Sequence, residues 1–145
     1  MSDVSSAERL EVRTFPEPDA SIIQKIDGIL IALNQQTLKL QRKAMVIALY
    51  DKDEFTGGVY FRWYGESAML DYMAVEEKWR NQGVGKRLVL AAEKEMLQQG
   101  CRQILVDTMA FQAPGFYQHM GYEITATITD YYGSHDRIIL RKRLP

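Results

Sequence analysis

The stretch Arg80-Asn81-Gln82-Gly83-Val84-Gly85 decides the fold of this chain, because it sets two glycines between a predicted strand and a predicted helix. An apolar run at 69–75 precedes it, and a helical pattern at 84–99 follows it. The first N–H groups of a helix lack internal partners, and that end of the helix is positive. Without β-carbons, the glycine amides can approach phosphate oxygens closely. The stretch therefore predicts a turn that binds a pyrophosphate.

Two other phosphate-binding loops do not fit this stretch. A Walker A loop needs Ser or Thr after its Gly-Lys pair, whereas Arg87 follows Lys86, and Arg80 stands where its first glycine would be. A dinucleotide fingerprint needs a third glycine at position 88, which is Leu88. The remaining pattern, R-x-x-G-x-G, resembles the coenzyme A loop of the GNAT superfamily of N-acetyltransferases. The alternative is an ordinary helix start with a charged rim.

Composition indicates a globular protein with a real core. The chain has 145 residues, 46% of them hydrophobic, with 18 basic and 19 acidic side chains and a net charge of −1. Such balance argues against a nucleic-acid-binding protein. No apolar run is long enough to span a membrane, and Met1–Glu11 lacks a signal-peptide core. The single cysteine, Cys101, excludes an internal disulfide framework, and we expect a cytoplasmic protein.

Hydrophobic periodicity predicts alternating strands and helices. We expect a flexible segment at 1–9 and one domain at 10–145. Ser21 and Gln24 fit a capping box at the start of a first helix, and 51–58 is expected to be a turn-rich connection. The expected strands lie at 10–15, 45–50, 59–64, 68–75, 104–108, 122–128 and 137–144, and the later helices at 84–99 and 113–119.

The GNAT resemblance covers nearly the whole chain from about residue 10. Besides the loop, it includes Gly100-Cys101, the segment Phe111-Gln112-Ala113-Pro114-Gly115-Phe116-Tyr117, which looks like a bacterial subgroup, and Gly121-Tyr122. It implies an α/β (α+β) GNAT fold with a mixed, mostly antiparallel central sheet of about six to seven strands. About four helices should cover both faces. The sheet should splay between its fourth and fifth strands, 69–75 and 104–108, and leave a slot for a pantetheine arm.

The resemblance also implies acetyl-CoA as cosubstrate and an N-acetyltransferase that moves the acetyl group to a primary amine by direct attack in a ternary complex. The implied coenzyme contacts are Tyr72, Met73, Ala74 and Val75 on the fourth strand, Arg80, Asn81, Gln82, Gly83, Val84, Gly85 and Lys86 in the loop, and Tyr117. The family's frequent Asn seven residues before this tyrosine is Ala110 here, which puts one pantetheine contact in doubt.

Catalysis needs an acid and a proton acceptor. An amine with a pKa near 10.4 is neutral in only about one molecule in 2,500 at pH 7. Tyr117 matches the family tyrosine that protonates the leaving thiolate, although it could also serve only in packing. Asp71 is the candidate base, with a salt-bridged structural role as the alternative. Glu66, Asp107 and water are further candidates, Asp107 being expected to cap a loop. No metal site is indicated.

The acceptor is open between a small-molecule amine and a protein amino group. Aromatic residues of the hairpins, accompanied by carboxylates, would suit a cationic amine or else pack on the sheet or in a homodimer; they are Phe61, Trp63, Tyr64, Tyr131 and Tyr132. Two alternatives to an enzyme remain at this point. One is a coenzyme A-binding module without catalysis, and the other is a protein that binds a nucleotide.

Overall fold

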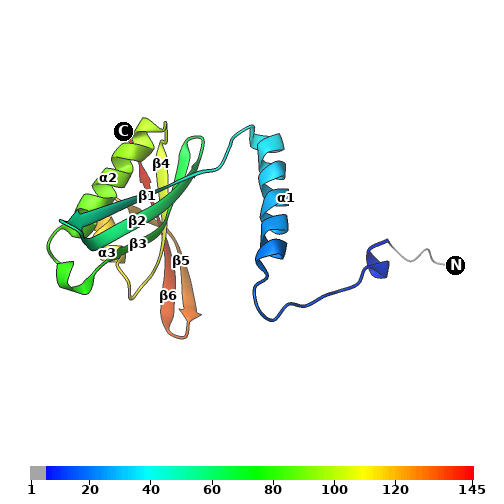
Figure 1. Ribbon diagram of the computed structural model, residues 1–145. Helices are drawn as coiled ribbons and strands as arrows, with labels where there is room; N and C mark the ends of the chain where they lie inside the picture. The colour runs from blue at the N-terminus through cyan, green and yellow to red at the C-terminus, as the bar shows by residue number, and fades with distance from the viewer. Residues whose placement is uncertain (1–5) are drawn as a thin grey trace. The chain divides into compact units, whose positions relative to one another are not determined.

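A computed structural model describes residues 6–145 of the chain, which divides into two compact units, Met1–Lys39 and Leu40–Pro145 (Figure 1). Within the described residues, no helix is both long and apolar enough to cross a membrane. The expected flexible segment 1–9 lies largely outside the described residues, and the expected domain boundary at residue 10 stays a prediction.

The first unit contains the 3₁₀ helix η1 (Ser6–Arg9) and the helix α1 (Ala20–Leu38). The N-cap of α1 is Asp19, whose Oδ1 accepts hydrogen bonds from the Ser21 and Ile22 amides at 2.9 and 3.0 Å. The predicted capping box was therefore wrong, because the carboxylate of Asp19 takes the helix amides and Ser21 lies inside the helix. The predicted strand at 10–15 was also wrong, since no described strand pairs with that segment.

The second unit is built on one six-stranded sheet in the order β1-β2-β3-β4-β6-β5. Its elements are β1 (Lys43–Asp51), β2 (Glu54–Tyr64), β3 (Ser67–Val75), the 3₁₀ helix η2 (Glu77–Trp79), α2 (Val84–Gln98), β4 (Gln103–Met109), α3 (Pro114–His119), β5 (Glu123–Tyr132) and β6 (His135–Arg143). Only β3 and β4 pair in parallel, so the sheet is mixed and mostly antiparallel, as predicted.

The connection expected at 51–58 is mostly strand. The turn shrinks to two residues, and β2 already begins at Glu54. Gly57, which looked like a turn residue, lies inside β2, where a β-carbon would stand 2.8 Å from the Ala74 carbonyl oxygen and 3.3 Å from Leu88. This glycine is needed because β2 passes close to β3 and α2, and not because the chain reverses there.

The predicted splay is confirmed between β3 and β4. Their ladder runs only from Ser67↔Gln103 to Leu70↔Val106, although β3 continues to Val75 and β4 to Met109. Beyond that last pair, the edge of β3 that faces β4 has no strand partner in the described part of the chain. The sheet therefore opens toward the carboxyl ends of these two parallel strands.

The core lies between one face of the sheet and the helices α2 and α3 (Figure 1). Leu88, Val89, Ala92 and Met96 of α2 are fully buried against Phe61, Ile104 and Leu140 of the sheet. In this unit both helices cover the same face, so the expected helices on the opposite face are not seen within it. Here α2 and α3 flank the open end of the β3–β4 pair.

Candidate active site

The splay opens into a cavity of about 1190 Å³ that joins the loop before α2 to the tyrosine of α3. Of the predicted coenzyme contacts, the cavity is lined by Tyr72, Met73, Ala74, Val75, Arg80, Asn81, Gly83, Val84, Gly85, Lys86 and Tyr117, and the candidate base Asp71 lines it as well. Gln82 is absent from this lining, and its side-chain amide donates to the Lys78 carbonyl at 2.7 Å. The structure thus brings together residues that are up to 46 positions apart in the sequence.

The loop reaches α2 through a left-handed turn. Asn81 has φ 59° and Gly83, the N-cap, has φ 82°. The first bond inside the helix is donated by the Arg87 amide to the Gly83 carbonyl at 3.0 Å. The amides of Val84, Gly85 and Lys86 come before it and lack helical acceptors. These three residues line the cavity, so the helix end can bind an anion there.

The two loop glycines serve different purposes. At Gly83 the positive φ disfavours any side chain, and a β-carbon would meet no protein atom within 4 Å. At Gly85 a β-carbon would lie 3.4 Å from Phe116, which is an ordinary contact. The first glycine is thus required by the backbone, whereas the protein alone does not forbid a small side chain at the second.

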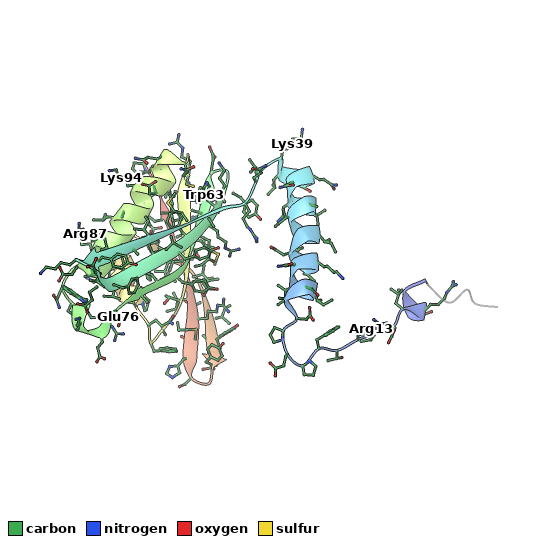
Figure 2. The ribbon with its side chains drawn as sticks, in the orientation of Figure 1. Arg13, Lys39, Trp63, Glu76, Arg87 and Lys94 are labelled. Carbon is green, nitrogen blue, oxygen red and sulfur yellow. The ribbon has the colours of Figure 1, made fainter. Side chains whose placement is uncertain are left out.

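Positive charge is placed unevenly around the loop. Arg80 and Lys86 line the cavity, and the Arg80 Nε also donates to the Val75 carbonyl at 3.1 Å. Lys78 forms an ion pair with Glu54. Arg87 lies on the exposed side of α2 together with Lys94 (Figure 2). Of the basic residues Lys78, Arg80, Lys86 and Arg87, only Arg80 and Lys86 therefore line the cavity and are available to an anion there.

Tyr117 lines the cavity, and its ring is packed between two aromatic neighbours. The ring contacts Phe116 and Tyr122 edge-on, with centroids 5.1 and 5.6 Å away, and the residue is 6% exposed. Within residues 6–145 its hydroxyl has no hydrogen-bond partner. Burial raises the pKa of Tyr117 to about 12, so the phenol keeps its proton at neutral pH. The group can donate a hydrogen bond to whatever occupies the cavity.

The three candidate bases differ in position. Asp71 and Asp107 line the cavity, whereas Glu66 lies at the opposite end of β3, beside a second, smaller cavity. Asp71 receives two hydrogen bonds from Arg62, at 2.6 and 2.7 Å. Asp107 was expected to cap a loop, but in the structure its carboxylate pairs with Arg137 instead. Both cavity carboxylates are therefore held by a guanidinium, and this favours the salt-bridged alternative for Asp71.

Sequence reasoning missed Gln112. Its Oε1 accepts hydrogen bonds from the Met109 amide at 2.9 Å and the Thr108 hydroxyl at 3.1 Å, and the residue lines the cavity. With the oxygen committed, its NH₂ group is the part left for a ligand. Gln112 follows Ala110 by two residues, so an amide side chain reappears close to the missing Asn. The polar residue directly before Ala113 and Pro114 was the available signal.

The aromatic residues proposed for the acceptor separate into two groups. Phe61 and Trp63 are 0% and 6% exposed and belong to the core, so of the two alternatives left open for them the structure supports packing on the sheet. They point to the α2 face because the strand alternates. Tyr131 and Tyr132 are exposed on β5, and Tyr131 accepts a hydrogen bond from Arg137 at 2.7 Å.

The two histidines of the chain lie in different places. His119 lines the cavity, and His135 packs against Phe111.

Comparison with known proteins agrees with this geometry. Residues 41–124 match the acetyltransferase (GNAT) domain. A blasticidin-S acetyltransferase from Streptomyces morookaense is 35% identical over 69% of this chain and 76% of its own length. The crystal structure of an acetyltransferase from Bacillus cereus has a TM-score of 0.77 and 26% identity over 91% of this chain and 98% of that one.

An aminoglycoside 6′-N-acetyltransferase complexed with coenzyme A shares the fold, with a TM-score of 0.64 and 20% identity over 88% of this chain and 82% of that one. A noncatalytic coenzyme-binding module is not what these relatives indicate. The loop at the start of α2, the open strand pair beside it and the match over 41–124 lead to one conclusion. The chain belongs to the GNAT family of acetyltransferases, which use acetyl-CoA to acetylate an amine.

Proposed function

We propose that this protein transfers the acetyl group of acetyl-CoA to the primary amine of a small molecule by direct attack in a ternary complex. The observation that carries the proposal is that one continuous cavity connects an anion-binding helix end, an open strand edge and a phenol. The curated relative is named for blasticidin S rather than for a protein, and this favours a small acceptor.

The loop would hold the pyrophosphate. The amides of Val84, Gly85 and Lys86 would donate to its oxygens, and the side chains of Arg80 and Lys86 would offset its charge. The pantetheine arm would lie along β3 from Val75 back to Tyr72, in the place of the strand that the sheet lacks there. Gln112 would donate from the opposite side, in place of the Asn that Ala110 replaces.

The chemistry then requires one bond to form and one to break. The ammonium form of the acceptor first loses a proton to water, and the neutral nitrogen attacks the thioester carbon. The C–S bond breaks as the amide forms, and the Tyr117 hydroxyl protonates the departing thiolate. The phenolate then takes up the proton that the attacking nitrogen releases as it becomes an amide. Burial raises the pKa of Tyr117 to about 12, so the phenol still carries its proton at neutral pH and can give it to the thiolate as the C–S bond breaks.

Asp71 is not well placed to be a free base. Both of its oxygens already accept hydrogen bonds from Arg62, so taking a proton would compete with a bidentate ion pair. We propose that water removes the amine proton and that Asp71 acts on the acceptor by hydrogen bonding.

The first test is acetyl-CoA-dependent release of free thiol with a panel of small primary amines and a lysine-containing peptide. The proposal expects thiol release that requires both acetyl-CoA and an amine, and an acetylated small amine by mass spectrometry. Acetylation of the peptide in preference to every small amine would contradict the choice of acceptor. Thiol release with no acceptor requirement would contradict transfer to an amine.

Three further expectations from the sequence are retained as proposals: one domain at 10–145, a homodimer and a cytoplasmic location. β5 is an exposed edge strand, which a second copy could pair with, and light scattering of the purified chain tests this. The buried free thiol of Cys101 suits a reducing compartment.

A further inference from the structure

Three polar side chains that the mechanism does not use lie together behind the wall of the cavity. Glu93 of α2 and Tyr122, which follows α3, are 8% and 2% exposed, and the side chain of Lys142 of β6 is 23% exposed. None of the three lines the cavity. Because taking a carboxylate and an ammonium out of water costs solvation free energy, a cluster of this kind needs a physical explanation.

The cluster uses every donor of its ammonium group. Lys142 Nζ donates to Oε1 and Oε2 of Glu93 at 3.0 and 3.1 Å and to the Met120 carbonyl at 2.7 Å. The Tyr122 hydroxyl donates to Oε1 of the same carboxylate at 3.1 Å. An ammonium has three N–H donors, and each has an acceptor here. The relative positions of these groups are therefore closely defined.

The bond to Met120 fixes the end of α3. The last carbonyls of a helix lack helical amides, and Met120 is the C-cap of α3. Lys142 supplies a donor to this carbonyl from β6. Because α3 has only six residues, it is too short to keep its direction without contacts to the rest of the protein. The direction of α3 thus depends in part on the cluster.

The position of the Tyr117 phenol depends on the same groups. The Tyr122 ring meets the Tyr117 ring edge-on, with centroids 5.6 Å apart and an interplanar angle of 73°. The Tyr122 amide also donates to the Tyr117 carbonyl at 3.0 Å. Lys142 Nζ in turn lies 5.6 Å from the centroid of the Tyr122 ring. Since Tyr117 is carried by α3 and packed on Tyr122, a shift of the cluster would move its hydroxyl.

The other partner in the cluster belongs to the helix that would bind the coenzyme. Glu93 lies in the same continuous helix as Val84, at whose amide the proposed pyrophosphate site begins. The cluster therefore joins α2 to the turn that carries Tyr117. An apolar trio of similar volume would fill the core as well, but it would give no directed bond to the Met120 carbonyl.

We propose that Glu93, Tyr122 and Lys142 are positioning residues for acetyl transfer, which hold the end of α3 against α2 so that the Tyr117 hydroxyl stands at a fixed place relative to the bound thioester. This role rests on the proposed function. The three side chains touch neither substrate nor coenzyme, and they act only through Tyr117.

The test measures free thiol released from acetyl-CoA with the small primary amine that reacts fastest in the panel above. The variant combines Glu93→Gln with Lys142→Met, because Lys142→Met alone would leave a buried carboxylate without its cation. We expect kcat to fall at least about tenfold, since a displaced catalytic group loses rate steeply with distance. KM for acetyl-CoA should change less than about twofold, because the first turn of α2 is untouched.

The same two substitutions are then made in protein that carries Tyr117→Phe. We expect them to lower the remaining kcat less than about twofold there, because no hydroxyl is left to position. A general loss of structure would lower kcat by the same factor with and without the Tyr117 hydroxyl. This comparison separates positioning from stability.

A milder variant and a control complete the experiment. Tyr122→Phe keeps the ring and removes only the hydroxyl that is bonded to Glu93, so it decides the matter if the double variant does not fold. It should lower kcat about threefold or more, again only where the Tyr117 hydroxyl is present. The control is Lys94→Met, which removes an ammonium beside Glu93 on the exposed side of α2 and should leave kcat unchanged (Figure 2).

A kcat equal to that of the parent in both cluster variants would overturn the positioning role, as would equal losses with and without the Tyr117 hydroxyl. Either result would leave the proposed acetyltransferase function standing. Near-parent turnover by Tyr117→Phe alone would refute the phenol as the acid. If no amine of the panel releases thiol, the proposed function itself fails. Each of these last two results removes the positioning role as well.

Discussion

The two ends of the cavity are built from different materials. At the α2 end, backbone amides of Val84, Gly85 and Lys86 make the binding surface, and the helix start fixes their direction. At the strand end, side chains from β3, β4 and α3 make it, and each depends on a neighbour for its position. A backbone site can be encoded by two glycines in one short stretch, whereas a side-chain site depends on contacts between distant strands. We therefore expect the first end to be common to the family and the second to set the acceptor.

The largest effect should come from Tyr117→Phe, which keeps the ring packing and removes the proton donor at the strand end. Turnover should fall by about 10²–10⁴, the usual contribution of a general acid, while acetyl-CoA affinity changes little. Steady-state rates and melting temperatures measured together check this. Tyr50→Phe on β1, an exposed tyrosine outside the cavity, is the control. Near-normal turnover with lowered stability would make Tyr117 a packing residue only.

The burial of Tyr117 should also make the free energy of unfolding depend on pH in the alkaline range. Burial raises the pKa of Tyr117 to about 12, above the value near 10 of an unfolded tyrosine. The unfolded chain therefore releases this proton first, so its stabilising contribution is complete below about pH 10 and is lost as the pH rises toward 12. The loss should be on the order of 3 kcal/mol for this group.

Tyr122 lies beside it, and burial also raises its pKa. Urea unfolding of the parent and of Tyr117→Phe, measured near about pH 9 and about pH 11.5, separates the two tyrosines. The variant should lose less stability than the parent over this interval. Identical losses of stability in the parent and the variant would mean that the Tyr117 hydroxyl is solvated. The claim that this end of the cavity excludes water would then be contradicted.

The smallest expected effect is at Gln112, between the two ends. Gln112→Ala removes an amide that we place against the pantetheine arm, and acetyl-CoA affinity should fall about fivefold, the value of one neutral hydrogen bond. Gln103→Ala is the matched control, because that amide is bonded to the Ser67 hydroxyl at 2.9 Å and does not line the cavity. If both variants and the parent bind acetyl-CoA with equal affinity, Gln112 does not contact the coenzyme.

The sequence predicted the loop end of the cavity better than the features that depend on contacts between distant strands. The loop and the α2 helix were predicted because local periodicity and two glycines encode them. The gap between β3 and β4 was expected from the resemblance to the GNAT fold. The turn at 51–58 was misplaced, since Gly57 is small to let β2 pass β3 and α2, a tertiary reason that local pattern does not carry.

The arginine partners of Asp71 and Asp107 could not be predicted from the sequence for a similar reason. Arg62 reaches Asp71 across a β-bulge that shifts the register of β2 and β3 between Tyr60 and Phe61, and Arg137 reaches Asp107 from a strand 30 residues later. The sequence left Phe61 and Trp63 open between an acceptor groove and the core, because aromatic residues of a hairpin fit both, and the structure places them in the core. Only the observed register decides between these faces.

The most direct test of the account is calorimetric titration with acetyl-CoA of the parent, Gly83→Val and Gly100→Val. Gly83 and Gly100 have φ of 82° and 86° at the two ends of α2, and at neither would a β-carbon meet a protein atom within 4 Å. Valine should therefore strain both sites alike, but only Gly83 lines the cavity. We predict that Gly83→Val weakens acetyl-CoA binding at least about tenfold and that Gly100→Val does not. Unchanged binding by folded Gly83→Val would contradict the claim that this loop holds the coenzyme.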